Sequence, residues 1–376
     1  MGQHANDTSH GRLSRRLLMQ RLAAAGFASP VIASITSSEG LAEVAGSSAP
    51  DDSAADLTGP HPIHDTPLDD AFLTPNDRFF ARSAGRAPDI APDTYRLSIG
   101  GLVDSPLELT LDDLRSREQV THTAFLECSG NGLPSSHVQP RTGAIGNAAW
   151  TGTPLAAILA EAGVQDGAVQ VATQGADLPA SRRGLPLRKA LAPDTILAWR
   201  MNGEDLPAAH GGPVRLLVPG WGGIASTKWL IGIDATDRVL AKDRDHHRCT
   251  VQPDHRLHPV RELPVKSVIV VPAAGDTVRA GEQAIMGYAW SGYGGIARVA
   301  VSSDGGDTWS EAEIVERAGR HAWVRFVARW DARPGRARLL ARATDEMMLT
   351  QPCPGPWHAR GYYANAVLEV PVTVTA

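Results

Sequence analysis

The sequence predicts an α+β protein of two domains, in which a mixed α/β domain is followed by an all-β immunoglobulin-like sandwich. The chain has 376 residues, 43% of them hydrophobic, which is enough for two ordinary cores. Gly (37) and Pro (27) are plentiful, which favours a loop-rich mixed or β protein over a helix bundle. From residue 263 onward, short β-like runs recur at regular spacing, as in a sandwich.

The amino-terminal segment has the layout of an export signal. Residues 11–33 begin basic, continue with a short apolar run and end in small residues, and they contain Ser14-Arg15-Arg16-Leu17-Leu18-Met19. We expect residues 1–45 to be a twin-arginine signal peptide, 46–66 to be a flexible tether, and the protein to be periplasmic. The alternative is a chance arginine pair in an amphipathic helix.

Composition limits the partners that we expect. The net charge of −5 gives no reason to propose nucleic acid or an anionic membrane. No apolar run beyond the first fifty residues is long enough to span a bilayer, so no stable membrane anchor is expected.

The first domain is expected at residues 67–262. Thr110, which stands before two aspartates, is a plausible helix N-cap. Alternation and helical spacing predict a helix at Leu155–Ala162, and strands at Asp93–Leu102, Gln170–Asp177, Ile196–Met201 and Val214–Val218.

The second domain is expected at residues 263–376. Its predicted strands are Val265–Val271, Gln283–Trp290, Ile296–Ser302, Ala322–Trp330, Ala337–Ala343 and Ala366–Val374. The run from Ser303 to Trp309 contains Asp-Gly-Gly and predicts a hairpin turn.

The stretch from His122 to Gly132 carries the main chemical signal. Cys128 follows the apolar run Thr123–Leu126 and precedes a loop of Ser, Gly and Asn. A thiol at the carboxyl end of a strand can point into a cleft, and small residues after it let backbone N–H groups approach a charged cofactor. A buried structural cysteine is the alternative.

A second informative stretch runs from His210 to Trp229. Pro219-Gly220 ends an apolar strand, and the glycine-rich loop after it lets the backbone approach a phosphate. The Walker spacing of a general phosphate loop is absent.

The segment Glu-Cys-Ser-Gly-Asn at residues 127–131 resembles the sulfite oxidase family of molybdenum oxidoreductases, which includes exported sulfite and sulfane dehydrogenase subunits. The resemblance continues in order through Phe79–Arg82, Trp150–Leu155, His210–Arg215 and Lys228-Trp229. It implies a sulfite-oxidase-type molybdopterin domain, a sandwich that forms a homodimer, and a molybdenum held by one pterin and the Cys128 thiolate.

The resemblance also assigns roles to individual residues. It implies that Arg82, Cys128 and Arg360 are catalytic, with both arginines facing the substrate oxyanion. The alternatives are an Arg82 that snorkels from the core and an Arg360 on a solvent-exposed edge strand. The resemblance also assigns Asp177 to pterin binding, for which the alternative is a turn aspartate that caps its own backbone. The implied cofactor-binding set is Arg82, Ser83, Cys128, Asp177, His210, Arg215, Ser226, Thr227 and Lys228.

Several positions depart from the family pattern. Gly132 and Leu133 stand where sulfite oxidases have two arginines, Ser83 where Asn often stands, and Pro140 where a tryptophan is common. When positions are counted from Trp229 without gaps, Cys249 stands where sulfite oxidases have a tyrosine near the metal. We therefore expect a conserved pocket frame with a changed substrate lining.

These observations predict an exported oxidoreductase that oxidises a small sulfur oxyanion, sulfite-like or sulfane sulfur, by oxygen-atom transfer. There is no Cys-x-x-Cys-His haem motif, so we expect no haem in this chain and a separate c-type cytochrome or other redox carrier as electron acceptor. One rival is an S-oxide reductase of the same family. Another is a binding protein without metal.

The cysteines and a charged segment leave two further expectations. Three widely spaced cysteines form no disulfide framework; Cys249 and Cys353 either pair or are buried, and burial is favoured. The His- and Asp-rich segment 243–258 fits no zinc spacing, so a solvated loop is favoured over a second metal site.

Overall fold

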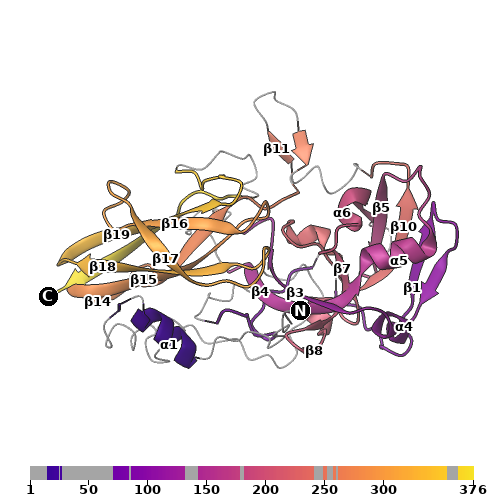
Figure 1. The fold of residues 1–376 in the computed structure, drawn as a ribbon, viewed down its shortest axis with the longest axis horizontal. Coiled ribbons are helices and arrows are strands. Elements are labelled where there is room, and N and C mark those ends of the chain that lie inside the picture. Colours follow the sequence, from indigo (N-terminus) through magenta and orange to yellow (C-terminus); the bar gives the residue numbers. More distant parts are fainter. Residues whose placement is uncertain are drawn as a thin grey trace, which may run out of the picture.

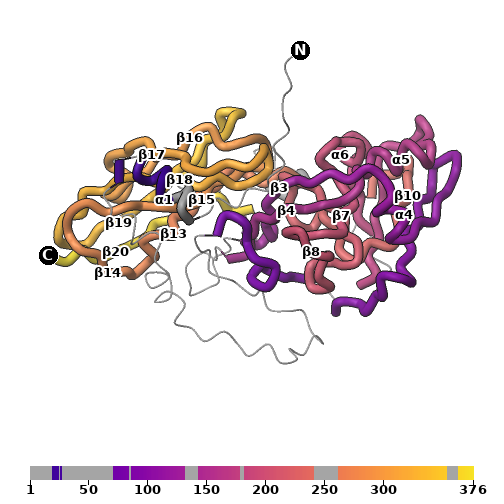
Figure 2. Tube along the Cα trace, turned by 60° about the horizontal axis from the view of Figure 1, so that its bottom comes forward, coloured from indigo at the N-terminus to yellow at the C-terminus, as the bar shows by residue number. Residues whose placement is uncertain are grey.

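The computed structural model describes residues 15–24, 26–27, 71–83, 86–131, 143–177, 182–240, 249–251, 257–259, 261–353 and 363–376. It has two halves that lie side by side along the long axis (Figure 1), and the same arrangement is seen from a second direction (Figure 2). One half contains two β-sheets with short helices, and the other contains the strands of the β-sandwich. The α+β class, with a sandwich following a mixed domain, is therefore confirmed.

The outer sheet of the first half has five strands in the order β2-β1-β10-β5-β6. The β1–β10 pair is parallel and its neighbours are antiparallel. The strands span Leu97–Gly101 (β1), Leu107–Leu109 (β2), Gln170–Gly175 (β5), Arg182–Pro186 (β6) and Leu230–Thr236 (β10).

The inner sheet carries the Cys128 segment. Its order is β3-β4-β7-β8, and β9 also pairs with β7. Both layers pack around helix α5 and an aliphatic core that includes Leu97, Ile158 and Leu216. The strands and helices are Val120–Glu127 (β3), Ile145–Pro154 (β4), Ile196–Met201 (β7), Glu204–Asp205 (β8), Arg215–Leu217 (β9), Leu111–Ser116 (α4), Leu155–Ala162 (α5) and Leu187–Ala190 (α6).

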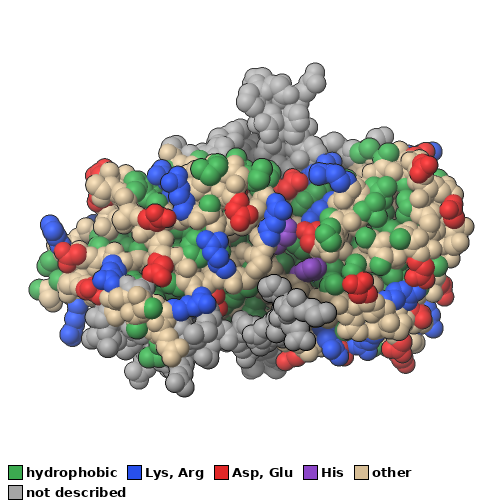
Figure 3. Space-filling view, viewed as in Figure 1, with side chains coloured by type: hydrophobic (Ala, Val, Ile, Leu, Met, Phe, Trp, Pro, Cys, Tyr) green, Lys and Arg blue, Asp and Glu red, His purple; other side chains and the backbone are tan. Residues whose placement is uncertain are grey.

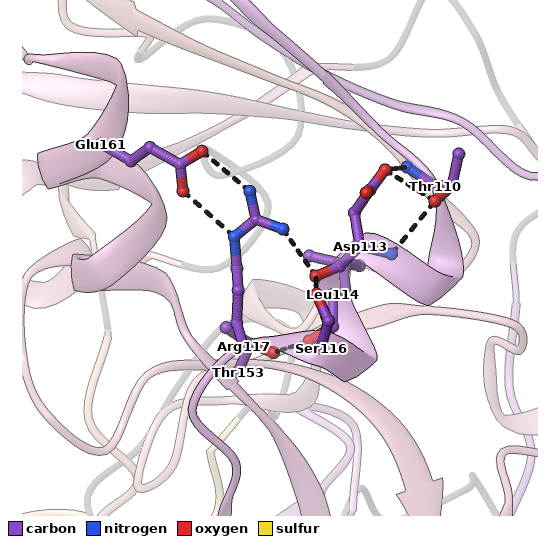
Figure 4. Close-up of polar contacts among 7 residues, drawn as sticks. All are labelled: Thr110, Asp113, Leu114, Ser116, Arg117, Thr153 and Glu161. Carbon is purple, nitrogen blue, oxygen red and sulfur yellow. Dashed lines mark hydrogen bonds and ion pairs between the residues drawn. The ribbon is translucent and has the colours of Figure 1, made fainter.

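Thr110 is the N-cap of α4, as predicted. Its hydroxyl accepts from the Asp113 amide at 3.0 Å, and the Asp113 carboxylate accepts from the Thr110 amide at 2.8 Å, which completes a capping box (Figure 4). Arg117 follows the helix and donates to both oxygens of Glu161 on α5, at 3.0 and 2.8 Å. These contacts join α4 to α5 on the surface of the first half.

The second half is a β-sandwich whose strands run in the order β13-β15-β18-β17-β16-β19-β20-β14. Its core includes Phe326, Leu339 and Trp330. The predicted turn joins β16 to β17, with Gly305 and Gly306 at φ of 82° and 103°. The strands span Lys266–Val271 (β13), Thr277–Arg279 (β14), Gly281–Trp290 (β15), Ile296–Ser302 (β16), Ser310–Glu316 (β17), Val324–Ala332 (β18), Gly335–Asp345 (β19) and Glu369–Thr375 (β20).

Two small elements lie outside these sheets. A hairpin of β11 (Cys249–Val251) and β12 (Leu257–Pro259) falls within the charged segment that was expected to be a loop. Helix α1 (Arg15–Ala24) lies against the sandwich, where Leu22 and Phe27 are buried with Met286, Val315 and Val327. None of the helices described here is both long and apolar enough to cross a membrane.

The expectation that Cys353 is buried is wrong. Cys353 is a free, exposed thiol, in a bend after Pro352 that belongs to no strand and to neither core. A side chain in such a bend has no opposing layer to pack against. The side chain of Cys249 lies outside the described residues.

Candidate active site

Cys128 lies at the first position after β3, on a short turn that both sheet and loop hold in place. Its amide donates to the Ala144 carbonyl at 2.9 Å, and its own carbonyl accepts from the Asn131 amide at 2.8 Å. The side chain is half-buried and forms no disulfide. The thiol is therefore at the carboxyl end of a strand, as predicted, on a backbone fixed from both sides.

The glycine loop from Pro219 onward packs directly against this turn. A Cβ on Gly223 would lie 3.1 Å from the Glu127 carbonyl oxygen, and one on Gly222 would lie 3.1 Å from the Ser129 hydroxyl. Such separations leave little room for any larger residue. The structure thus brings together the two stretches that the sequence singled out.

Three basic side chains gather where this loop ends. Arg215 donates through Nη1 to the His210 carbonyl at 2.8 Å and through Nη2 to the Ser226 carbonyl at 3.1 Å. Lys228 is half-buried and donates to the Ala209 carbonyl at 2.8 Å. His210, Arg215 and Lys228 therefore form one basic cluster.

Burial sets the charge of this cluster. It lowers the pKa of Arg215 to about 9. It lowers the pKa of Lys228 to about 7, to which the Arg215 charge also contributes while Asp177 opposes the shift. Burial lowers the pKa of His210 to about 4, so its ring is neutral near pH 7 and serves as a hydrogen-bonding group rather than as a cation.

The segment before Arg82 is anchored on the same cluster. The Phe79 ring meets the His210 ring edge-on at 5.5 Å and lies against Gly146 of β4, the partner of Leu126 on β3. His210 Nε2 is 2.7 Å from the Asn76 carbonyl oxygen. Arg82 itself is exposed, three residues beyond Phe79, which agrees with the snorkelling alternative as well as with a substrate-binding role.

The remaining candidates are two hydroxyl side chains within the loop and two half-buried side chains outside it. The Ser226 hydroxyl accepts from the Val218 amide at 3.0 Å, and the Thr227 hydroxyl lies 2.8 Å from that of Thr173, so both hydroxyls brace the loop itself. Asp177 and Ser83 are half-buried, and Asp177 is close enough to Lys228 to affect its pKa.

Arg360 lies outside the described residues, but the chain three residues beyond it reaches the Cys128 turn. The Tyr363 amide donates to the Ser129 carbonyl at 2.9 Å, and the Ser129 hydroxyl lies 3.2 Å from the Tyr363 hydroxyl. The carboxyl-terminal segment of the second half therefore closes over the turn.

Sequence reasoning assigned no role to several residues that the structure places around Cys128. They are Glu127, Asn131, Lys266, Trp290 and Tyr363. One signal was available in the sequence, since Lys266 is a charged residue inside the predicted apolar run Val265–Val271. Its partner could not be identified without the fold.

A separate cleft of about 740 Å³ opens between the two halves, where Figure 3 shows histidines with charged side chains beside them. Its lining includes His122, Asp194 and His321, and none of the predicted site residues. Asp194 there binds Lys189 at 2.8 Å and His321 at 3.0 Å. These contacts satisfy Asp194, and the cleft lining includes neither Cys128 nor the basic cluster, so the cleft is a poorer candidate than the Cys128 turn.

Two family models match the chain. "Oxidoreductase molybdopterin binding domain" matches residues 84–243, and "Mo-co oxidoreductase dimerisation domain" matches residues 257–375. The solved structure of the sulfane dehydrogenase SoxCD from Paracoccus pantotrophus superposes with a TM-score of 0.73 at 34% identity, over 79% of this chain and 80% of that one.

Proteins of similar sequence point to the same family as the two family models. The mitochondrial sulfite oxidase of Rattus norvegicus is 36% identical over 82% of this chain, and the match spans 62% of the rat protein. The sulfite oxidase of Gallus gallus is 35% identical over 80% of this chain and 72% of its own length. The fold and site define a molybdopterin-binding protein with a dimerisation-type sandwich. The chain belongs to the sulfite oxidase family of molybdenum oxidoreductases.

The basic cluster suits a phosphorylated pterin. Arg215 lowers the pKa of both His210 and Lys228, and Asp177 is the acidic group that opposes this shift on Lys228. The buried Nε of Arg215 has no hydrogen-bond partner among the described residues. A bound anion would offset this excess of positive charge. In the same described part of the chain, no three His, Cys, Asp or Glu side chains gather into a metal cage.

Proposed function

We propose that this protein is an exported molybdopterin-dependent oxidoreductase that oxidises a small sulfur oxyanion, sulfite-like or sulfane sulfur. The observation that carries the proposal is the meeting of the Cys128 turn, the glycine loop and the basic cluster in one region of a chain from the sulfite oxidase family. The names of the related proteins, sulfite oxidase and sulfane dehydrogenase, support the class of substrate.

In this proposal each group has a defined task. The Cys128 thiolate ligates molybdenum, and Lys228 with the backbone of the glycine loop holds the pterin phosphate. Arg215 and His210 hold the loop and its approach in place through their bonds to backbone carbonyls. The bound cofactor supplies the two-electron redox chemistry.

Substrate recognition falls to arginines. Arg82 is exposed beside the anchored Phe79 segment, and Arg360 precedes the Tyr363 contact with Ser129. A guanidinium matches an oxyanion through two parallel hydrogen bonds, so both arginines bind and orient the substrate. Ser83 and Asp177 complete the set that we assign to the pterin.

The proposal also covers the export of the protein, its electron-transfer partner and its oligomeric state. The twin-arginine pattern at Arg15-Arg16 supports periplasmic export of an already folded, cofactor-loaded protein. The absence of a haem attachment motif from the sequence supports electron transfer to a separate c-type cytochrome. The dimerisation-domain match supports a homodimer.

A substrate panel tests the activity. Full-length protein from a molybdenum-competent host is mixed with sulfite, thiosulfate or a persulfide and an oxidised dye or cytochrome c. We expect reduction of the acceptor, and Arg82→Met should raise KM by about tenfold or more because the fixed cation is lost. Arg86→Met, an exposed arginine just beyond, is the matched control and should leave KM unchanged.

Two results would contradict the proposal. Turnover of an S-oxide with a reduced dye, and none with sulfur donors, would show the reductase instead. Protein that contains neither molybdenum nor pterin would indicate the binding protein.

A further inference from the structure

The carboxylate of Glu127, which directly precedes Cys128, is buried and fully engaged. Glu127 is 1% exposed and ends β3. Oε1 accepts from Lys266 Nζ at 2.5 Å and from Asn131 Nδ2 at 2.9 Å, while Oε2 accepts from Trp290 Nε1 at 2.8 Å. A charged carboxylate thus lies one residue from the candidate metal ligand, with donors on both of its oxygens.

Two of these donors come from the other half of the molecule. Lys266 begins β13 and Trp290 ends β15, and the two residues are direct partners in that antiparallel pair. Lys266 is 5% exposed and Trp290 is fully buried. Two side chains at the end of the β13–β15 pair therefore bind the last residue of β3.

The same network reaches around the Cys128 turn. Asn131 donates to Glu127, and its side-chain oxygen accepts from the Ala144 amide at 3.2 Å. The Ala144 carbonyl in turn accepts from the Cys128 amide. Lys266 Nζ also lies 3.4 Å from the Asn131 carbonyl oxygen. The ion pair is thereby linked to both ends of the turn.

We propose that the Glu127–Lys266 pair is a positioning device for Cys128: it fixes the turn that carries the thiolate and neutralises the carboxylate beside it. This rests on the proposed function insofar as Cys128 ligates molybdenum. Breaking a buried pair by removing one partner leaves an uncompensated charge in a medium of low dielectric constant. Removing both charges together avoids that cost.

The rival explanation is that the pair only holds the two halves together. Under that explanation Lys266→Gln lowers stability but leaves the local structure at Cys128 and the metal's electronic state unchanged. Another buried ion pair of the sandwich, Arg325 with Glu316 at 3.1 Å, offers a matched control. Its side chains are 3% and 4% exposed, against 6% and 2% for Lys266 and Glu127.

The test compares Lys266→Gln, the neutral double variant Glu127→Gln with Lys266→Gln, and Arg325→Gln, all as full-length protein. The first readout is amide hydrogen exchange in residues 126–131, followed by mass spectrometry. The second is the Mo(V) electron paramagnetic resonance spectrum, together with the Mo(VI)/Mo(V) midpoint potential at one fixed pH.

We expect Lys266→Gln to speed exchange in the turn about tenfold, because it leaves the buried Glu127 carboxylate uncompensated and opening the turn lets that charge reach water. We also expect altered g values and a lower midpoint potential, because an unpaired negative charge opposes addition of an electron. The double variant should return toward wild type in both readouts. Arg325→Gln should lower the melting temperature only.

Two outcomes would overturn the inference. One is a Lys266→Gln protein with wild-type exchange and spectrum despite a lower melting temperature. The other is a double variant as perturbed as the single one. If wild-type protein gives no molybdenum signal, the proposed function fails, and the exchange experiment still decides whether the pair positions the turn.

Discussion

At the scale of single residues, the positive charges of the basic cluster repel one another until an anion binds. His210, Arg215 and Lys228 each have a pKa lowered by burial, and two of them are lowered further by neighbouring cations. The Trp150 ring covers the Arg215 guanidinium at 5.1 Å, which leaves Lys228 as the half-buried cation of the three. Lys228 is therefore the member best placed to meet a phosphate.

The pKa of His210 predicts a pH dependence of stability. Its folded value of about 4 lies below the ordinary 6.5, so between these values the unfolded chain binds a proton that the folded chain does not. Stability is fully present above about pH 6.5 and falls as the pH drops toward 4, by at most about 3 kcal/mol.

Urea unfolding of full-length, cofactor-free protein at pH 7 and pH 4.5 checks this prediction. His210→Gln keeps a donor for the Asn76 carbonyl and should lose less stability over that range than wild type. Equal losses in the two proteins would show that His210 does not carry the effect.

Only part of this residue-level picture could be predicted from sequence. The strand-then-glycine pattern placed Cys128 and the 210–229 stretch correctly in local structure. The inward direction of Arg215 could not be predicted, because it depends on Trp150, 65 positions earlier in a different strand. The Lys266 partner of Glu127 is likewise set by packing between the halves.

At the scale of elements, local signals succeeded where they were strong. Helix α5 and strands β7 and β16 have the predicted boundaries, because apolar spacing and clear turns define them. β17 was missed because most of its side chains are polar or exposed, as in Ser-Glu-Ala-Glu. β10 was also missed, although its run Leu-Ile-Gly-Ile is apolar; its pairing with β1 and β5, both distant in the sequence, could not be predicted from a local pattern.

The capping box of α4 gives a second prediction. Thr110→Ala removes the hydroxyl that accepts from the Asp113 amide, and should lower the free energy of unfolding by about 1 kcal/mol. Urea unfolding measures the loss, with Thr110→Ser as a control that retains the hydroxyl. Molybdenum content should stay at the wild-type level, and a fall in metal without a loss of stability would contradict the assignment of a purely structural role.

At the scale of the whole molecule, the candidate site is built where the two halves meet. Glu127 binds Lys266 and Trp290, Ser129 contacts Tyr363, and the Phe125 amide donates to the His321 carbonyl at 2.8 Å. Contacts with the sandwich therefore hold the final residues of β3 in place. The predicted domain boundary between residues 262 and 263 stays a prediction. The structure adds that residues of the sandwich hold β3 and the Cys128 turn in place.

The central claim is that the Cys128 thiolate holds molybdenum, and X-ray absorption at the molybdenum edge tests it most directly. Full-length holoprotein is compared with Cys128→Ser, and with Cys353→Ser as a control at an exposed free thiol. We predict that Cys128→Ser keeps its fold by circular dichroism but loses one sulfur neighbour of the metal together with turnover, while Cys353→Ser matches wild type. An unchanged sulfur count and full activity in Cys128→Ser would contradict the account.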